Sequence, residues 1–330
     1  MKVTLFATLL LLAVAGTALA QQQPQFTHYG LNGMYLNPAY AGIKGQGEVG
    51  LILRYQYLNY SGVDAGGSPR TGLVTLSLPV LALGGGVGVA VYYDQAGQAK
   101  MTNAALSYSQ HIKLGSGKLG VGIQGIYTYL GKGTYRAIDP DDINVPRDAS
   151  DNKFDLGAGL WYESPKLYAG LSLNNLVRSE YSFKSAGTSG NKSNYLAENH
   201  AYFTAGYNID ATSNVVVTPM VLAKAVLPGD FSSASKFNNA KNYSFEGGVR
   251  ATIDDKYWIG ANYRHEESIS GLLGLSFSKD NAMRVGYAFD FIAFNQDARA
   301  LSSHEIMLSY RLPKPGLLIR PAIRTPRYSF

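Results

Sequence analysis

The sequence predicts an all-β fold, a transmembrane up-and-down antiparallel β-barrel of about 14 strands with long extracellular loops and short periplasmic turns. Three observations predict it. Many short segments alternate apolar and polar residues, the connections between them alternate in length, and an export signal precedes them all. Successive strand residues point to opposite faces of a sheet. In an outer-membrane barrel the apolar face meets lipid and the polar face lines the lumen.

The clearest alternating segment is 281–291. Its apolar face would carry Met283, Val285, Tyr287, Phe289 and Phe291. Its other face would carry small or charged residues, including Arg284 and Asp290. A soluble sandwich would also alternate in this way, with the apolar face turned toward a core. The alternation alone therefore predicts strands, and the connections have to decide between the two folds.

The predicted strands are close to the roughly 9–11 residues that a tilted membrane-spanning strand needs. They span 48–59, 70–78, 85–94, 100–112, 117–130, 153–163, 166–175, 199–209, 214–226, 243–252, 256–266, 270–278, 281–291 and 303–312. The even-numbered connections include the short turns 163–166, 210–213, 254–255 and 278–280. The odd-numbered connections include the long segments 131–152, 176–198, 227–242 and 293–302. This alternation is typical of barrels with periplasmic turns and extracellular loops, and it predicts that both termini lie in the periplasm.

The ends of the chain divide it into further parts. Residues 1–20 are predicted to be a signal peptide, with Lys2, the apolar run 5–14 and the cleavage site Ala18-Leu19-Ala20. The apolar run is shorter than the ~20 residues of a spanning helix. The remaining parts would be an N-terminal periplasmic or plug segment (21–47), the outer-membrane barrel (48–312) and a basic, proline-rich C-terminal tail (313–330).

Composition excludes several classes of protein. Charged residues make up 16% of the chain, while Gly (37), Tyr (24) and Phe (13) are abundant, as crowded barrel interiors and interfacial aromatic girdles require. The absence of cysteine excludes disulfides and thiolate metal sites. The net charge of +6 is modest and no arginine-rich run is present, so we expect no nucleic-acid partner.

The predicted lumen face carries charges of both signs. Its polar residues are Arg54, Gln56, Asp155, Lys224, Glu246, Arg250, Arg264, Arg284, Asp290, Glu305 and Arg311. Mixed signs predict ion pairs across the lumen rather than a filter ring of one sign. Fourteen strands lie between small filled barrels and porins of about 16 strands. We therefore expect a narrow or plugged lumen, with an open pore as the alternative.

Several patterns suggest enzymes or cofactors but lack the necessary context. Gly120–Gly125 matches G-x-G-x-x-G, yet it lies inside a predicted strand and opens no helix, as a dinucleotide site requires. Ser303 and His304 are neighbours, so a strand places them on opposite faces and they cannot act as a catalytic pair. The five histidines are scattered and predict interface or lumen side chains. We expect no catalytic, cofactor-binding or metal residues, and no cofactor.

Two features leave alternatives open. A loop carries Asp139, Asp141, Asp142, Asp148 and Asp151, whose carboxylates could bind calcium, although their spacing is not that of an EF-hand and a solvated loop is the simpler interpretation. The N-terminal segment could plug the barrel, seal its periplasmic mouth or simply lead into the first strand. The tail could dock on an acidic partner or remain solvated. Candidate partner-binding residues are Asn37, Pro38, Tyr40, Gly42, Lys314, Arg320, Arg324 and Arg327.

The mature chain resembles the PorP/SprF family of outer-membrane proteins of the type IX secretion system. The resemblance rests on Gln25-Phe26, Asn37-Pro38-Ala39-Tyr40-Ala41-Gly42, Arg54-Tyr55-Gln56-Tyr57, Gly62, Ser68-Pro69-Arg70-Thr71, Leu76-Ser77-Leu78-Pro79, Asp94, Gly97, Thr218-Pro219, the run from Ser303 to Tyr310, and Arg327-Tyr328. One departure is Tyr57, where family members often carry Trp. Both are interfacial aromatic residues, so the departure leaves the predicted fold unchanged.

The resemblance implies a non-enzymatic barrel that acts in type IX secretion and gliding motility. Some family members contact periplasmic ring or peptidoglycan-associated components, and others help export or anchor one large secreted surface protein, such as an adhesin. The implied partners are therefore one or both of these classes, together with outer-membrane lipid. A diffusion channel for small solutes and an outer-membrane enzyme are the hypotheses from other classes.

Overall fold

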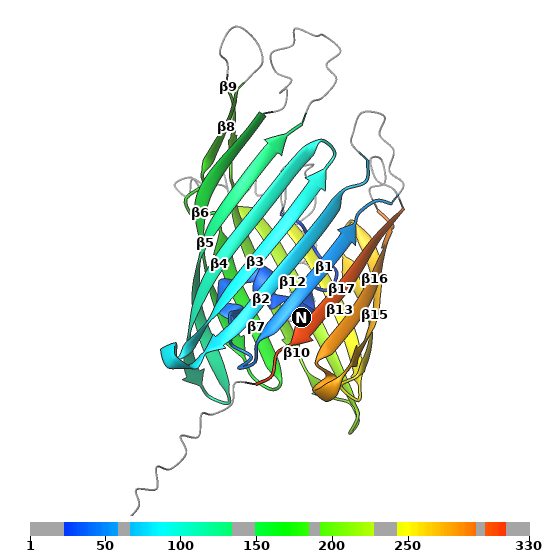
Figure 1. Cartoon of the computed structure of the whole chain (residues 1–330). Coiled ribbons are helices and arrows are strands. Elements are labelled where there is room, and N and C mark those ends of the chain that lie inside the picture. The colour runs from blue at the N-terminus through cyan, green and yellow to red at the C-terminus, as the bar shows by residue number, and fades with distance from the viewer. Residues whose placement is uncertain are drawn as a thin grey trace, which may run out of the picture.

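The computed structural model describes residues 23–58, 67–133, 149–184, 192–227, 243–294 and 301–314. Fourteen strands form a closed antiparallel β-barrel, as the sequence predicts (Figure 1). The strands are β1 (Glu48–Tyr55), β2 (Arg70–Val80), β3 (Gly85–Ala96), β4 (Ala99–Leu114), β5 (Gly117–Lys132), β6 (Ala149–Glu163), β7 (Leu167–Asn174), β10 (Asn199–Tyr207), β12 (Val215–Leu227), β13 (Tyr243–Ile253), β14 (Tyr257–Arg264), β15 (Ser268–Phe277), β16 (Met283–Ile292) and β17 (Ser302–Arg311).

Each barrel strand pairs with its neighbours along the chain, and the first strand pairs with the last. In this closing pair Leu51 lies opposite Leu308, and Arg54 lies opposite Glu305. Every one of these fourteen strands is thus paired on both sides, which a lipid environment requires. We call the two rims the turn end, where β6 is joined to β7 and β13 to β14, and the loop end, where β1 and β16 finish.

Three short strands lie outside the predicted set, together with the 3-10 turns η3 (Leu81–Leu83) and η4 (Lys279–Asn281) in strand connections. The hairpin of β8 (Glu180–Lys184) and β9 (Lys192–Leu196) stands above the loop end beside β6, within the connection predicted for 176–198 (Figure 1). Its Phe183 is fully buried in a cluster with Leu130 and Tyr181. Each strand of the hairpin has only five residues, which is shorter than the roughly 9–11 residues expected of a membrane-spanning strand. The two-residue strand β11 (Ile209–Asp210) extends the pairing along β12.

The two faces of the wall match the predicted alternation. On β16, Met283, Tyr287 and Phe289 are exposed to the outside, while Ala288 and Asp290 are buried inside. Because the outward face is apolar and the strands of the wall are paired, the wall suits a lipid environment. No helix in the described part of the chain combines the length and apolar character needed to cross a membrane.

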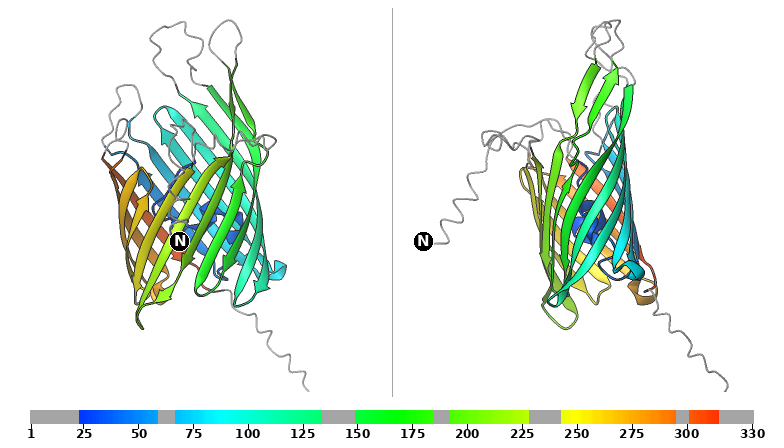
Figure 2. Two further views of the ribbon diagram at one scale, coloured as in Figure 1. Left: turned by 180° about the vertical axis from the view of Figure 1, so that it is seen from behind. Right: turned by 90° about the vertical axis from the view of Figure 1, so that its left-hand side faces the viewer.

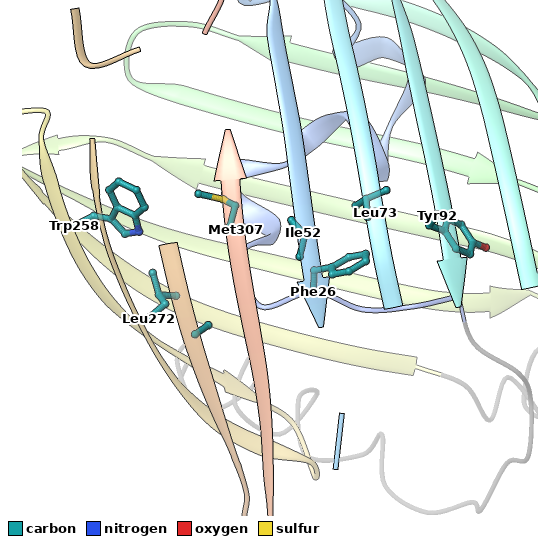
Figure 3. Packing of buried hydrophobic residues seen from close by; sticks show 8 residues of the cluster. Phe26, Ile52, Leu73, Tyr92, Trp258, Leu272 and Met307 are labelled. Carbon is teal, nitrogen blue, oxygen red and sulfur yellow. The ribbon is translucent and has the colours of Figure 1, made fainter. Parts of the chain in front are cut away.

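A hydrophobic cluster lies inside the barrel rather than in its wall. It surrounds Phe26, which is 2% exposed, and brings together inward residues of consecutive strands from β3 through β1 and β17 to β14 (Figure 3). These are Ile52, Leu73, Tyr92, Trp258, Leu272, Ala288 and Met307. Phe26 also packs edge-on against Tyr35, with ring centroids 5.0 Å apart. The N-terminal segment therefore supplies part of the core on which the inner faces of the strands pack.

We predict that Leu308→Arg on β17 destabilises the barrel by about 2–4 kcal/mol if this exposed position lies at the bilayer midplane. The matched control is Tyr310→Arg, which faces the same way near the turn end and should cost about 0–1 kcal/mol. Denaturant unfolding of the barrel in lipid vesicles measures both. Equal costs at the two positions would contradict this placement of β17.

Candidate functional site

The candidate site is the barrel lumen and the chain inside it, residues 23–47, which we call the lumen segment. It contains η1 (Tyr29–Leu31), α2 (Gly33–Leu36) and η2 (Pro38–Tyr40), which lie within the barrel in views from behind and from the side (Figure 2). Hydrogen bonds join it to strands on all sides, among them β1, β4, β7, β13 and β17. The cavities beside it have room for only about one or two water molecules each.

At the loop end, the segment docks on a buried ionic group. Arg54 on β1 pairs with Asp290 on β16 (Nη2–Oδ2, 2.5 Å) and with Glu305 on β17 (Nη1–Oε2, 3.1 Å). The Thr27 hydroxyl donates to Asp290 at 2.7 Å. The backbone N–H groups of Thr27 and His28 donate to the two oxygens of Glu305 at 2.8 and 2.9 Å. All three charged side chains are at most 2% exposed, so donors from the segment take the place of water around the two carboxylates.

A second ionic group continues the network. Arg264 on β14 pairs with Glu246 on β13 (Nη2–Oε2, 2.9 Å). The Asn262 amide donates to Glu246 at 2.9 Å and to the Thr27 carbonyl at 3.1 Å. The Gln25 amide donates to Glu246 at 3.0 Å. Lumen charges of opposite sign therefore form ion pairs, but these pairs join strands that lie next to or near each other in the wall and do not cross the lumen as predicted. The contacts of Gln25 and Thr27 also show that the lumen segment is part of the same network.

The lumen segment runs from the loop end to the turn end. The Tyr202 hydroxyl donates to the Gln23 side-chain carbonyl at 2.6 Å, and Lys224 donates to the Gln23 backbone carbonyl at 2.5 Å. Both donors lie in the loop-end halves of their strands, whereas Gly42 reaches Ser77 near the turn end. The described chain therefore begins near one rim and finishes at the other, beyond β17. Residues 1–22 and 315–330 are outside the described ranges, so the prediction that both termini lie in the periplasm stays a prediction.

Asn37 fixes the segment to the wall near the turn end. Its Nδ2 donates to the carbonyls of Leu160 and Leu171, residues paired across β6 and β7, at 2.9 and 3.0 Å. Its Oδ1 accepts the Ala39 N–H at 2.9 Å and so caps η2. Pro38 is the first residue of η2, where its missing N–H costs nothing. The sequence Asn-Pro-Ala therefore builds a turn that locks onto two strands.

Tyr40 and Gly42 finish this contact. The Tyr40 ring packs edge-on against Trp161, with centroids 5.0 Å apart. Gly42 has φ +68°, and a Cβ there would lie 2.7 Å from the Leu78 carbonyl oxygen, so only glycine fits. Asn37, Pro38, Tyr40 and Gly42 are all buried inside the barrel. Their assignment to partner binding stays a prediction, because a partner could touch them only if the segment left the lumen.

Glycines on the inner faces of the strands give the segment room. At Gly122 on β5 a Cβ would lie 2.3 Å from the Ala39 nitrogen, and at Gly120 it would lie 2.5 Å from the Ala39 carbonyl oxygen. Both belong to the G-x-G-x-x-G pattern. The third glycine of the pattern, Gly125, lies on the opposite face of the strand. A Cβ there would have no described atom within 4 Å. The pattern therefore reflects close packing of the segment on a strand, and it opens no helix.

The remaining candidates fall into two groups. Asp151 accepts a hydrogen bond from the Ser182 N–H at 2.8 Å, whereas the other four aspartates of its cluster lie outside the described residues. Among the described residues, no three His, Asp or Glu side chains are grouped to hold a metal. Lys314 follows β17 at the turn end, and Arg320, Arg324 and Arg327 lie outside the described residues. Their role in partner binding stays a prediction.

Ser303 and His304 lie on opposite faces of β17, as alternation predicts. Ser303 is fully buried in the lumen, whereas the His304 ring meets the Tyr287 hydroxyl at 2.7 Å on the outside. Sequence reasoning missed the roles of Gln25 and Thr27, because irregular backbone carries no periodic signal. The mixed charges of the lumen face were the only sign that a polar partner would be needed there.

We predict that Arg54→Leu destabilises the barrel by about 3–5 kcal/mol, because it leaves two buried carboxylates without this cation. It should also increase amide hydrogen exchange in residues 25–30, since Thr27 and His28 dock on Glu305. The control is Arg70→Leu, an exposed arginine whose side chain contacts Gln95, and it should change neither quantity. Unchanged exchange in 25–30 after Arg54→Leu would contradict the proposed docking.

We predict that Gly122→Val displaces the lumen segment and costs about 1–3 kcal/mol, since its Cβ would overlap Ala39. Gly125→Val, on the same strand with open space at its Cβ, should be close to neutral. Limited proteolysis within residues 23–47 and denaturant unfolding measure the two effects. Equal protection of the segment in both variants would refute the steric explanation.

Comparison with known proteins gives both a family and fold neighbours. The family described as type IX secretion system membrane protein PorP/SprF matches residues 18–310. No curated protein matches the chain. Among solved structures, the Ralstonia pickettii toluene transporter TbuX is 11% identical, with TM-score 0.49, covering 86% of this chain and 93% of that one. The CymD monoaromatic hydrocarbon channel is 12% identical, with TM-score 0.45, covering 85% and 91%.

These two likenesses concern the barrel fold alone, because both identities are low. The family match identifies the family, because it extends from the residues before the lumen segment to the last barrel strand. It thus includes the strands, the ionic groups of the lumen and the segment that docks on them. The chain belongs to the type IX secretion system membrane protein family PorP/SprF.

Proposed function

We propose that this protein is a non-enzymatic outer-membrane barrel of the type IX secretion machinery. In this proposal it binds other proteins and assists the export or surface anchoring of a large secreted protein, such as an adhesin. The observation that carries the proposal is the lumen segment, which packs against strands on all sides and is held by buried ion pairs. A barrel filled in this way is better suited to recognition than to diffusion.

The filled lumen argues against a diffusion channel. A path for solutes would require Phe26, Met34 and Ile43, each at most 3% exposed, to leave their contacts. It would also require the carboxylates of Asp290 and Glu305 to lose the hydrogen bonds that Thr27 and His28 donate. Each buried polar group left without a partner costs about 1–3 kcal/mol. The sum of these costs favours the filled state.

Surfaces for protein partners remain at both rims. At the loop end, the β8–β9 hairpin extends the wall and is fixed to β6: the Asp155 carboxylate accepts the N–H groups of Val177 and Ser179 at 2.9 and 3.1 Å. At the turn end, β17 leads into the basic sequence that begins with Lys314. In the proposal the loop end meets the exported protein and the tail reaches the periplasm.

A second candidate is a core component that links the outer membrane to the periplasmic ring. The observation that favours it is the placement of the chain after β17 at the turn end, where the sequence from 313 to 330 is basic and has no acidic residue. Such a tail suits an acidic periplasmic surface. The two candidates differ in the partner and in the rim that binds it.

Affinity purification from the native outer membrane in a gentle detergent, with mass spectrometry, tests the proposal. We expect a large secreted protein bearing a type IX C-terminal signal. Recovery of ring subunits and periplasmic lipoproteins in its place would assign the core role. In a matched variant, Lys314, Arg320, Arg324 and Arg327 are changed to serine. Loss of ring subunits from this variant alone would locate their site on the tail.

We also predict that the intact protein gives little steady conductance in planar lipid bilayers, because the lumen segment fills the barrel. Deletion of residues 23–41 should raise the conductance if the wall stays closed, which heat-dependent gel mobility of the barrel checks. A large steady conductance of the intact protein would contradict the filled lumen and favour the channel.

A further inference from the structure

Arg250 is a lumen cation that no carboxylate of the described residues pairs with. It lies on the inner face of β13, three residues before that strand finishes at the turn end. Its Nη1 atom is buried and has no hydrogen-bond partner in the described part of the chain. The lumen arginines Arg54 and Arg264 differ from it, since each pairs with at least one carboxylate within 3.1 Å.

Other hydrogen-bond donors lie close to Arg250. A Cβ built on Gly30 would lie 3.4 Å from the Tyr168 hydroxyl and 3.9 Å from the Arg250 Nη1 atom, so both groups face one point of the lumen segment. The Tyr29 hydroxyl lies within electrostatic range of Arg250. Tyr29 is 3% exposed, and its hydroxyl also lacks a partner among the described residues. The described groups around this point can therefore donate hydrogen bonds to a ligand that accepts them.

The described carboxylates at this end of the lumen pair with cations other than Arg250, and Glu163, for example, pairs with Lys44 at 2.5 Å. Arg284 lies within electrostatic range of Arg250, and its ion pair with Glu48 is long, at 3.7 Å. Arg311, at the end of β17, pairs with Asp255 at 3.9 Å, and that carboxylate is 72% exposed. The lumen segment from 23 to 47 has no acidic residue. The described part of the chain therefore brings no carboxylate into contact with Arg250 at this end.

We propose that the turn end of the lumen contains a carboxylate-binding site formed around Arg250. Its ligand would be an aspartate or glutamate side chain, or a chain terminus, on an acidic segment of a partner protein. A guanidinium binds a carboxylate in a planar, two-point geometry. A buried cation is strongly stabilised by gaining an opposite charge. The inference rests on the proposed function in one respect: the ligand belongs to a protein.

The position of the site favours a peptide that enters from the turn end. Gly30, Tyr168 and Arg250 keep partial exposure although the Nη1 atom is buried. Arg250 lies three residues from the turn-end finish of β13, so this rim is the nearer entry for a side chain. Arg311 and Lys314 lie beside the same rim. They would attract an acidic segment before one of its carboxylates reached Arg250. A single small anion would leave that outer positive charge unused.

The test uses the purified full-length barrel in detergent and a fluorescent glutamate-rich peptide, with a glutamine peptide of equal length as the probe control. Fluorescence anisotropy measures affinity at low and high salt. We expect the glutamate peptide alone to bind, and Arg250→Gln to weaken it about ten- to a hundredfold. Tyr29→Phe should weaken it about two- to tenfold while leaving the unfolding temperature unchanged. The control Arg70→Gln, at the loop end, should bind like the unaltered protein.

Three results would overturn the proposal. One is equal peptide affinity in the unaltered protein and Arg250→Gln. Another is binding of inorganic phosphate or acetate through Arg250, seen as a shift in unfolding temperature, with no binding of the peptide. If Arg250→Gln does not fold, the third result is full peptide affinity in both of two single variants, Tyr29→Phe and Arg250→Lys. Recovery of the secreted protein by the unaltered barrel tests the proposed function separately, so the two can fail independently.

Discussion

The structure depends on the buried ionic group at the seam where the first and last strands meet. Arg54 and Glu305 are direct cross-strand partners in the β1–β17 pair, and Asp290 lies on the next strand. Closing the barrel therefore brings one arginine and two carboxylates together, and each of these side chains is at most 2% exposed. One cation cannot satisfy four carboxylate oxygens, and unsatisfied buried charge is strongly unfavourable. Thr27 and His28 supply the missing donors, so closure of the wall and docking of the lumen segment stabilise each other.

This coupling explains why the interior combines polar side chains with glycine. The inward faces near the loop end carry the charges that hold the segment, whereas β3 and β5 near the turn end carry glycines that let its backbone approach. At Gly86 and Gly122 an added Cβ would lie 2.3 Å from backbone atoms of the segment. The segment is thus bound by electrostatic contacts at one end and by steric fit at the other. Near the turn end, Asn37 adds hydrogen bonds to carbonyls on both β6 and β7 to this steric fit.

The sequence predicts the wall well because one physical rule governs every strand. Lipid outside and polar groups inside impose a period of two, so residues such as Phe289 and Asp290 reveal both the strand and its faces. The same rule correctly separates Ser303 from His304. It does not reach the lumen segment, whose contacts depend on single positions such as Gly122 and Asn37 rather than on a repeat. The path from Gln23 at the loop end to Gly42 at the turn end follows from three-dimensional fit, and so does the β8–β9 hairpin, which is anchored by Phe183 and Asp155.

The direction of the lumen segment also explains why the two ends of the lumen differ in their balance of charge. The segment offers backbone N–H groups, a threonine, a glutamine and a histidine to the carboxylates near the loop end, but it has no carboxylate to offer the arginines near the turn end. The same chain therefore completes one half of the lumen and leaves the other half short of negative charge. Rearranging the segment could not correct this, because its composition lacks the necessary group. No described residue supplies this charge to Arg250, whose side chain keeps partial exposure near the turn end, where solvent ions or another chain can provide it.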